Sequence, residues 1–418
     1  MLQNSKGRRT VMMLANKYKS EFQIHRVLGM MQGPPSLNLF PTENRMSTLA
    51  MRALSSDAVH RYPFSEDSDS YYGDTGQLTE MSKNCAALAA EYFEAEHALV
   101  EGLSGLNIMH WILNSLLKRG DTVLIMDPTC GGHYATQKIC EDFGFKTAFI
   151  PFNRRTLDID IDKLEQVAKE HKPELMYIDS STLITIPDIP SIRNAVGTKT
   201  RICLDASQIL AFVPLDTLKI GMSSGLDILN GSTHKSFPGP QKGLVLVNDA
   251  NVKKALCDRL PYEISSAHPN SIGALAITLL ELMPHKKTYP KDIRNNAKAL
   301  SAHLVDLGFH VPGEHIGFTD TQQIWIEPFA EVSAHAWADQ LRKANVRTTV
   351  VPLPSTGKPG LRIGVQELTR MGMSTNIMKD VAQILYDCLV AKKAPAKLKG
   401  KIANICDSFS EVQYTQYS

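Results

Sequence analysis

The sequence predicts an α/β protein that has a mostly parallel central sheet and a smaller C-terminal α+β domain. The main observation is an alternation of short apolar runs with segments of helical periodicity between about Leu78 and Met283, which is typical of a parallel sheet. A second observation is the segment Pro284-His285-Lys286-Lys287, where this alternation stops and a mixed pattern begins. The third is the length of 418 residues, which is enough to bury the cores of two domains.

The individual elements follow in order along the chain. Strands are predicted in the first part at Thr122–Met126, Thr147–Ile150, Leu175–Ile178, Arg201–Leu204 and Gly243–Val247. The smaller α+β domain is predicted from the patterns at Ile293–Leu307, Gln323–Ile326, Ala334–Ala344, Val346–Val351 and Asn376–Val390. This gives an N-terminal segment at 1–45, a large domain at 46–284, a small domain at 285–391, and a tail at 392–418 that we expect to be loosely ordered.

The composition argues against several classes of protein. Acidic and basic residues are interspersed and the formal net charge is +2, so no surface for nucleic acid is indicated. No apolar stretch is long enough to span a membrane. Seven scattered cysteines without a CxxC spacing favour a reducing cytoplasm, and we expect no metal site. Residues 1–20 are basic, which faintly resembles a transit peptide, although a basic first helix is the preferred interpretation.

One lysine lies in an unusual loop. The segment Asn230–Pro240 places Lys235 among small residues, between the apolar run Leu226–Leu229 and the predicted strand Gly243–Val247. A lysine must lose its proton before it attacks an aldehyde, and an enclosed site favours the neutral amine. Lys235 therefore suits a Schiff base, and the alternative is an ordinary lysine of a surface loop.

A carboxylate follows an earlier strand. Asp205 comes directly after Arg201–Leu204, and open α/β sheets bind ligands at the carboxyl ends of their strands. Asp205 could therefore pair with the ring nitrogen of pyridoxal phosphate. Taken alone it could equally be a cap or turn residue. In this order along the chain, Asp205 and Lys235 together predict a pyridoxal-phosphate site.

Several short motifs support this hypothesis. They are Pro41-Thr42-Glu43-Asn44, Tyr71-Tyr72-Gly73, Ser104-Gly105-Leu106-Asn107, Gly131-Gly132-His133, Ser232-Thr233-His234-Lys235 and Gly360-Leu361-Arg362-Ile363-Gly364. From about Asn38 to about Val390, the chain resembles the serine hydroxymethyltransferase family of fold-type I pyridoxal-phosphate enzymes, in which such motifs occur in this order. The resemblance implies that the large domain at 46–284 binds the cofactor.

The resemblance also implies roles for individual residues. Lys235 would form the internal aldimine, Asp205 would pair with the ring nitrogen, and the imidazole of His133 would stack on the ring. The other implied positions are cofactor contacts at Ser104, Gly105, Gln208 and His234, substrate contacts at Thr42 and Arg362, and catalytic positions at Tyr62 and Tyr72 beside Lys235 and His133.

Each of these positions has an ordinary structural alternative. Ser104 and Gly105 could be a plain helix cap and a turn glycine, although a helix N-terminus also holds phosphate. His133 could face solvent. Arg362 lies among apolar residues, where an unpaired guanidinium is costly, so either a substrate carboxylate or a structural salt bridge could be its partner.

The chain departs from the family at three places. Tyr62 keeps the tyrosine of a Tyr-x-Glu motif, but Phe64 stands where the family has a glutamate that handles protons during folate-dependent transfer. Glu66 could replace that acid only if the loop is rebuilt. Gln208 replaces a histidine, and Phe237-Pro238-Gly239-Pro240-Gln241 differs from the usual bacterial sequence. These changes leave the lysine and the arginine intact and put the folate chemistry in doubt.

The resemblance therefore implies an enzyme that cleaves or forms the Cα–Cβ bond of threonine or serine through a glycyl quinonoid. An aldolase or a transaldolase is preferred, with an amino acid and an aldehyde as substrates, since threonine transaldolases are similar to this family. One alternative is a hydroxymethyltransferase with a folate or pterin carrier, and the other is a non-catalytic homologue. A homodimer or homotetramer is expected, in which Tyr72 and the loop Ser265-Ser266-Ala267-His268 could serve a neighbouring subunit.

Overall fold

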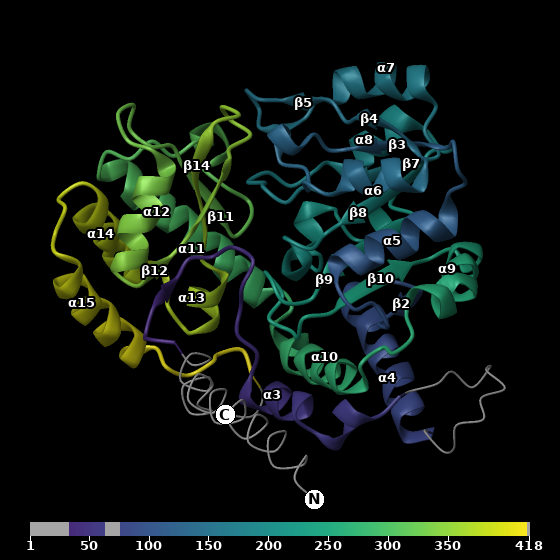
Figure 1. Cartoon of the computed structure of the whole chain (residues 1–418), viewed down its shortest axis with the longest axis horizontal. Coiled ribbons are helices and arrows are strands. Elements are labelled where there is room, and N and C mark those ends of the chain that lie inside the picture. The colour runs from purple at the N-terminus through teal and green to yellow at the C-terminus, as the bar shows by residue number, and fades with distance from the viewer. Residues whose placement is uncertain (1–32, 63–75, 416–418) are drawn as a thin grey trace, which may run out of the picture.

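A seven-stranded sheet forms the centre of the computed structural model, which describes residues 33–62 and 76–415 (Figure 1). Its strands, in spatial order, are β2 (His97–Leu99), β10 (Gly243–Val247), β9 (Ile228–Ser232), β8 (Arg201–Asp205), β7 (Leu175–Ile178), β3 (Thr122–Ile125) and β4 (Lys146–Phe149). Strand β10 is antiparallel to both of its neighbours, and all other pairs are parallel. The mostly parallel sheet is therefore confirmed.

Helices pack around this sheet. They are α3 (Thr48–Leu54), α4 (Gly76–Phe93), α5 (Gly105–Leu116), α6 (Thr136–Phe143), α7 (Ile161–His171), α8 (Ile189–Val196), α9 (Ala250–Glu263) and α10 (Pro269–Leu282). Every residue of β7, β9 and β10 is buried. Strands that are buried along their whole length are covered on both faces of the sheet, and β7 and β10 also have the apolar sequences typical of such strands.

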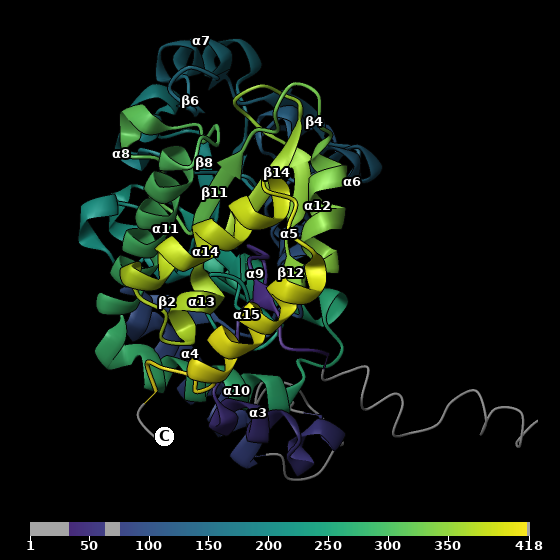
Figure 2. The same cartoon turned by 90° about the vertical axis from the view of Figure 1, so that its left-hand side faces the viewer.

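A second, antiparallel sheet lies beside the first (Figures 1 and 2). Its strands are β11 (Gln323–Ile326), β14 (Pro359–Gly364) and β13 (Thr349–Pro352), in that order. The accompanying helices are α11 (Thr288–Asp306), α12 (Ala334–Lys343), α13 (Gln366–Arg370) and α14 (Thr375–Leu389). This is the α+β arrangement that the sequence predicts, and the boundaries proposed at 284 and 391 stay predictions.

Two small pairs of strands complete the described structure. Strand β1 (Leu37–Asn38) runs parallel to β12 (Val346–Arg347), so the N-terminal segment lies against the C-terminal part of the chain. Strands β5 (Phe152–Asn153) and β6 (Asp158–Ile159) form an antiparallel pair. No helix within 33–62 and 76–415 has both the length and the apolar character needed to cross a bilayer.

The expectation of a loosely ordered tail is wrong. Residues Pro395–Ser408 form α15, which packs against α14. Leu398 and Ile402 are buried beneath it, because residues four apart lie on one face of a helix. The basic composition of this segment hides that apolar stripe, and the stripe is what fixes the helix to the rest of the protein.

The residues after α15 are also held in place. The guanidinium of Arg370 donates from Nη1 to the backbone carbonyl of Tyr414 at 3.0 Å. The ring of Tyr414 packs against that of Tyr289, with centroids 4.9 Å apart. The residues near 414 therefore contact the body of the protein through a buried arginine and a tyrosine.

Two neighbouring parallel strands each place an aspartate at the same edge of the sheet. Asp205 ends β8, and Asp179 directly follows β7. Asp179 accepts hydrogen bonds from the hydroxyl of Thr136 and from the backbone N–H groups of Met126 and His133, at 3.4 and 3.3 Å for the two N–H groups. Burial raises the pKa of Asp179 to about 7, and the charge of Asp205 adds to this effect.

We predict that D179N changes how stability depends on pH. The pKa of Asp179 is about 7 in the fold, against 3.8 for an ordinary aspartate. Between about pH 4 and pH 7 the unfolded chain releases this proton more readily than the fold, so the stability of the wild type falls as the pH rises. D179N has no proton to lose. Its melting temperature relative to wild type should therefore rise across this range.

The matched control is D407N, at an exposed position of α15. The change with pH in melting temperature relative to wild type should be larger for D179N than for this control. The hydrogen bonds lost in D179N shift its melting temperature by the same amount at every pH. The test therefore depends on the slope of melting temperature against pH and not on its absolute value. A D179N curve parallel to that of wild type would contradict the assignment of a raised pKa.

Candidate active site

A hollow of about 370 Å³ opens at the carboxyl edge of the seven-stranded sheet. Five of the predicted site residues line it, namely Gly105, His133, Asp205, Gln208 and Lys235. They come from the start of α5, the turn after β3, the end of β8 and the loop after β9. Open α/β sheets bind their ligands at this edge. The structure thus brings together residues that lie up to 130 positions apart in the sequence.

The loop that carries Lys235 is fixed from two sides. Phe237 is fully buried and packs on the ring of Tyr92 with centroids 5.7 Å apart. The side-chain amide of Asn44 donates to the carbonyls of Lys235 and Ser236 at 2.8 and 3.1 Å. The loop is therefore not a free surface loop, and its lysine has a defined position.

The electrostatic environment of Lys235 favours the neutral amine. Burial lowers the pKa of Lys235, Asp205 opposes this shift, and Arg362 adds to it. Burial also lowers the pKa of His133, with Asp205 opposing the shift and Lys235 adding to it. The ordinary alternative for Lys235, a solvated surface lysine, does not describe this environment.

The carboxylate of Asp205 is oriented by two donors. The backbone N–H of Ser207 donates to one oxygen at 2.9 Å, and the hydroxyl of Tyr177 donates to the other at 3.3 Å. Burial raises the pKa of Tyr177 well above its usual value, so its proton stays available for this bond. The bond to Ser207 is one that a turn residue makes, so the structural alternative describes part of what Asp205 does. Asp205 also lines the hollow, and its oxygens can accept a further hydrogen bond from a protonated ring nitrogen.

The N-terminus of α5 provides a place for a phosphate. Gly105 leaves no room for a side chain, because an added Cβ would lie 2.5 Å from Oγ of Ser232. Ser207 and Ser232 form a hydroxyl pair beside it, 3.1 Å apart. The hydroxyl oxygen of Ser104 accepts a hydrogen bond from the backbone N–H of Asn107 at 3.1 Å. In this structure Ser104 is therefore the N-cap of α5, as the structural alternative proposed. Free N–H groups and hydroxyls at a helix start suit an anion.

The guanidinium of Arg362 is buried, and none of the described residues provides an anionic partner for it. Its exposure is 8% and its Nη1 donates to the carbonyl of Ser181 at 2.6 Å and to the hydroxyl of Thr182 at 3.3 Å. Its Nε reaches the hydroxyl of Thr349 at 3.4 Å. Among the ion pairs of the described residues, none involves Arg362, so the salt-bridge alternative is not found. Burial lowers its pKa to about 10, and a carboxylate ligand would compensate this charge.

Other predicted positions do not line this hollow. Thr42 lies half-buried in a turn, and Tyr62 is 54% exposed. His234 is half-buried beside the lysine, and burial lowers its pKa to about 4. The positions of Tyr72, Phe64 and Glu66 lie outside the described residues.

Several contributors to this site were not among the predicted site residues. Asn44 reaches the lysine loop from the N-terminal segment, and it stands in a motif that the sequence analysis did quote. Ser181 and Asp179 follow the apolar run of β7, where the rule on strand ends could have found them. Among the described residues, no cluster of three or more His, Cys, Asp or Glu side chains is arranged to hold a metal ion.

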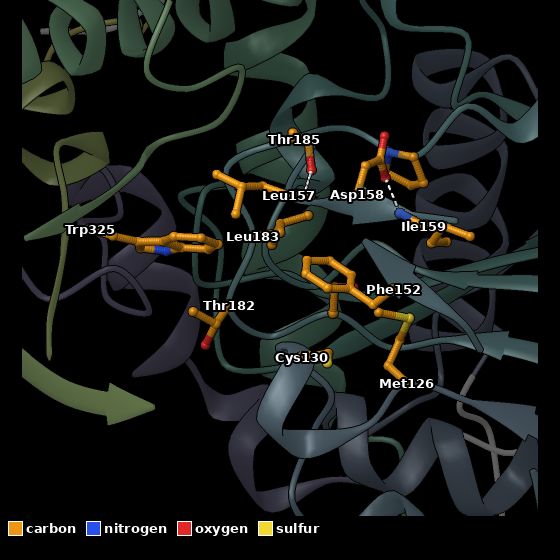
Figure 3. Close-up of a pocket in the computed structure, with 12 residues that line it drawn as sticks. Met126, Cys130, Phe152, Leu157, Asp158, Ile159, Thr182, Leu183, Thr185 and Trp325 are labelled. Atoms are coloured by element: carbon orange, nitrogen blue, oxygen red, sulfur yellow. Dashed lines mark hydrogen bonds between the residues drawn. The ribbon is translucent and has the colours of Figure 1, made fainter. Parts of the chain in front are cut away.

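A second hollow of about 310 Å³ lies beside the first (Figure 3). Trp325, Phe152 and Leu183 give it a largely apolar lining. Ser180 borders both hollows, and Thr182, which lines the second, binds Arg362. The segment 180–183 is therefore the wall between the two hollows.

Comparisons with known proteins agree with this geometry. The model of the serine hydroxymethyltransferase family matches residues 30–385. The serine hydroxymethyltransferase of Methanocella arvoryzae is 30% identical over 390 residues, which cover 91% of this chain and 92% of that protein. That of Archaeoglobus fulgidus is 28% identical over 391 residues, which cover 91% of this chain and 89% of that protein.

A solved structure shows the fold class. The crystal structure of L-threonine transaldolase from Pseudomonas fluorescens in its internal aldimine state covers 98% of this chain and 94% of its own, with a TM-score of 0.86 and 24% identity. The predicted fold, that of a fold-type I pyridoxal-phosphate transferase, is thereby confirmed. The cradle of small residues, the lysine and the aspartate all fit this cofactor. The chain belongs to the serine hydroxymethyltransferase family and is a pyridoxal-phosphate-dependent enzyme.

Proposed function

We propose that this enzyme cleaves and forms the Cα–Cβ bond of β-hydroxy amino acids such as threonine and serine, as an aldolase or a transaldolase. The observation that carries the proposal is the buried guanidinium of Arg362, which pairs with no anion among the described residues and lies beside the hollow that holds Lys235. A free amino acid brings one carboxylate to this cation and one amine to the site of the lysine.

The side chains of the site have separate tasks in this proposal. Lys235 supplies a neutral amine for attachment of the cofactor, because burial lowers its pKa. Asp205 holds a proton on the ring nitrogen, and His133 faces the ring. Bound pyridoxal phosphate supplies an electron sink for the charge that is left on Cα when the Cα–Cβ bond breaks.

Arg362 fixes the substrate in a single orientation. Nη1 is bound to Ser181 and Thr182 and Nε to Thr349, so the N–H groups of Nη2 are available for the substrate carboxylate. Holding the carboxylate would fix the orientation of the amino acid relative to the bound cofactor. When the Cα–Cβ bond breaks, the β-hydroxyl group would give up its proton and the β-carbon would leave as the aldehyde. Cα would then take up a proton in an aldolase, or bond to the carbonyl carbon of a second aldehyde, whose oxygen takes up the proton, in a transaldolase.

Two observations favour this outcome over folate-dependent transfer. Phe64 cannot titrate, and it stands where the family has its proton-handling glutamate. The similar solved structure is that of an L-threonine transaldolase. The second candidate function is serine hydroxymethyltransferase, which is supported by the names of the relatives. A homodimer or homotetramer is proposed on family resemblance.

The proposal is tested by incubating the holoenzyme with L-threonine and no folate. We expect release of acetaldehyde and glycine, and a new β-hydroxy amino acid when a second aldehyde is added. Mass spectrometry identifies both products. Turnover of serine that requires a folate, with no cleavage of threonine, would instead establish the hydroxymethyltransferase.

K235A should abolish attachment of the cofactor. Borohydride reduction is expected to link the cofactor covalently to wild type at Lys235, which peptide mass spectrometry detects, and to leave K235A unmodified. The turnover number should fall by at least about a thousandfold, because the activated amine is lost. The control K199A, at an exposed position, should behave as wild type. Labelling of K235A at another lysine would contradict the assignment.

R362M should weaken substrate binding and leave the cofactor in place. Loss of a charge-assisted contact to the substrate carboxylate predicts a KM for threonine about 100-fold higher. The absorbance of the bound cofactor should be unchanged. R342M, which removes an exposed arginine paired with Asp339 on α12, is the control. A KM equal to that of the control would show that the carboxylate binds elsewhere.

A further inference from the structure

Three glutamine side chains meet where the two sheets approach each other. Gln208 follows β8 in the seven-stranded sheet, and Gln322 and Gln323 stand at the start of β11 in the three-stranded sheet. Their exposures are 3%, 0% and 0%. Buried amides are costly unless they are hydrogen-bonded, so the contacts among them determine how each one is oriented.

The orientation of Gln323 is set by the backbone. Its Oε1 accepts from the N–H of Leu183 at 3.2 Å, and its Nε2 donates to the carbonyl of Ser181 at 3.1 Å. A backbone N–H can only donate and a backbone carbonyl can only accept, so the reverse orientation of this amide is excluded.

This orientation fixes Gln208 in turn. Nε2 of Gln323 also reaches Gln208 at 3.0 Å, so the atom it meets must be the acceptor Oε1. Gln322 adds a second donor, at 2.6 Å from the carbonyl of Gln208 and 3.4 Å from its Oε1. With its oxygen held on this side, the amide nitrogen of Gln208 faces the cofactor hollow. No described residue accepts a hydrogen bond from it there.

Gln323 also helps to fix the backbone carbonyl to which Arg362 donates a hydrogen bond. The carbonyl of Ser181 accepts from both Gln323 and Arg362, at 3.1 and 2.6 Å. Trp325 lies two positions further along β11 and lines the second hollow beside Leu183 and Thr182 (Figure 3). Alternate residues of a strand share one face, so Gln323 and Trp325 lie on the side of β11 that faces the segment 181–183.

We infer that Gln323 is a positioning residue with two effects. It orients the N–H of Gln208 toward the cofactor, and it holds in place the carbonyl of Ser181 to which Arg362 donates. Gln208 presents a donor that cannot lose its proton at physiological pH, whereas a histidine at this place would titrate. Gln323 itself lines neither of the two hollows. It links the cofactor site on one sheet to the carboxylate site on the other.

This inference rests on the assignment of the hollow to the cofactor and of Arg362 to the substrate carboxylate. It does not depend on which aldehyde is transferred. The test therefore uses neither aldehyde nor folate. It measures the dissociation constant of pyridoxal phosphate, the absorbance maximum of the bound cofactor, and the dissociation constant of glycine for the holoenzyme.

Four variants separate the effect of Gln323 on cofactor binding from its effect on glycine binding. Q208L should weaken cofactor binding about tenfold and shift the absorbance maximum, with glycine binding within about twofold of wild type. Q323M should weaken both the cofactor and glycine about tenfold. In Q208L/Q323M the cofactor should bind no worse than in Q208L alone, because Gln323 acts on the cofactor through Gln208. The control Q340M, at a half-buried amide on α12, should match wild type.

Several results would overturn the inference. One is a Q323M variant that behaves as Q340M, and another is a double variant whose cofactor loss multiplies to about 100-fold. If Q323M does not fold, Q323E takes its place, since it keeps the acceptor for Leu183 and loses both donations, and the same pattern is expected. A wild type that binds no pyridoxal phosphate would overturn the proposed function as well, which distinguishes the two failures.

Discussion

The site depends on the positive charge of Arg362, which is buried and has no anionic partner within residues 33–62 and 76–415. Arg362 rests on a backbone carbonyl and two hydroxyls, which are neutral oxygens and compensate only part of the cost of burial. A carboxylate ligand would compensate the remaining cost of burying this charge. The three-stranded sheet must therefore be held firmly against the segment after β7, and the amide contacts across that junction do so.

The same charge acts on the lysine. Burial lowers the pKa of Lys235, the carboxylate of Asp205 opposes this shift, and Arg362 adds to it. An anion from one sheet and a cation from the other thus act together with burial on a residue between them. Any motion that separates the sheets would change the reactivity of this amine as well as the affinity for substrate.

Much of this arrangement could be predicted from local sequence. The run Leu175–Ile178 is apolar at every position, so both its type and its bounds agree with β7. Asp205 and His133 follow predicted strands, and parallel strands bring their carboxyl ends to one edge. The rule on strand ends therefore places these two residues together without knowledge of the fold. Lys235 follows the apolar run Leu226–Leu229, and the strand β9 that begins within this run was not among the predicted strands.

The rest could not be predicted, because it rests on contacts between distant segments. Gln208 and Gln323 are 115 positions apart, and no local pattern relates one buried amide to another. Ser104 could be read either as a phosphate contact or as a helix cap, and in this structure its hydroxyl is bound to the helix backbone. For α15, a basic composition concealed two apolar residues whose burial becomes visible only when α14 is in place.

The docking of Tyr414 has a consequence for the order of synthesis. Its ring packs on Tyr289, whose hydroxyl meets the amide of Asn44, and that amide holds the carbonyl of Lys235. Three segments that leave the ribosome at very different times therefore meet at one place. The nascent chain can form the seven-stranded sheet early, but the lysine loop gains its full support only once residue 414 has emerged. A chain that ends before residue 414 would therefore keep the residues of the sheet but lack part of the support for its lysine loop.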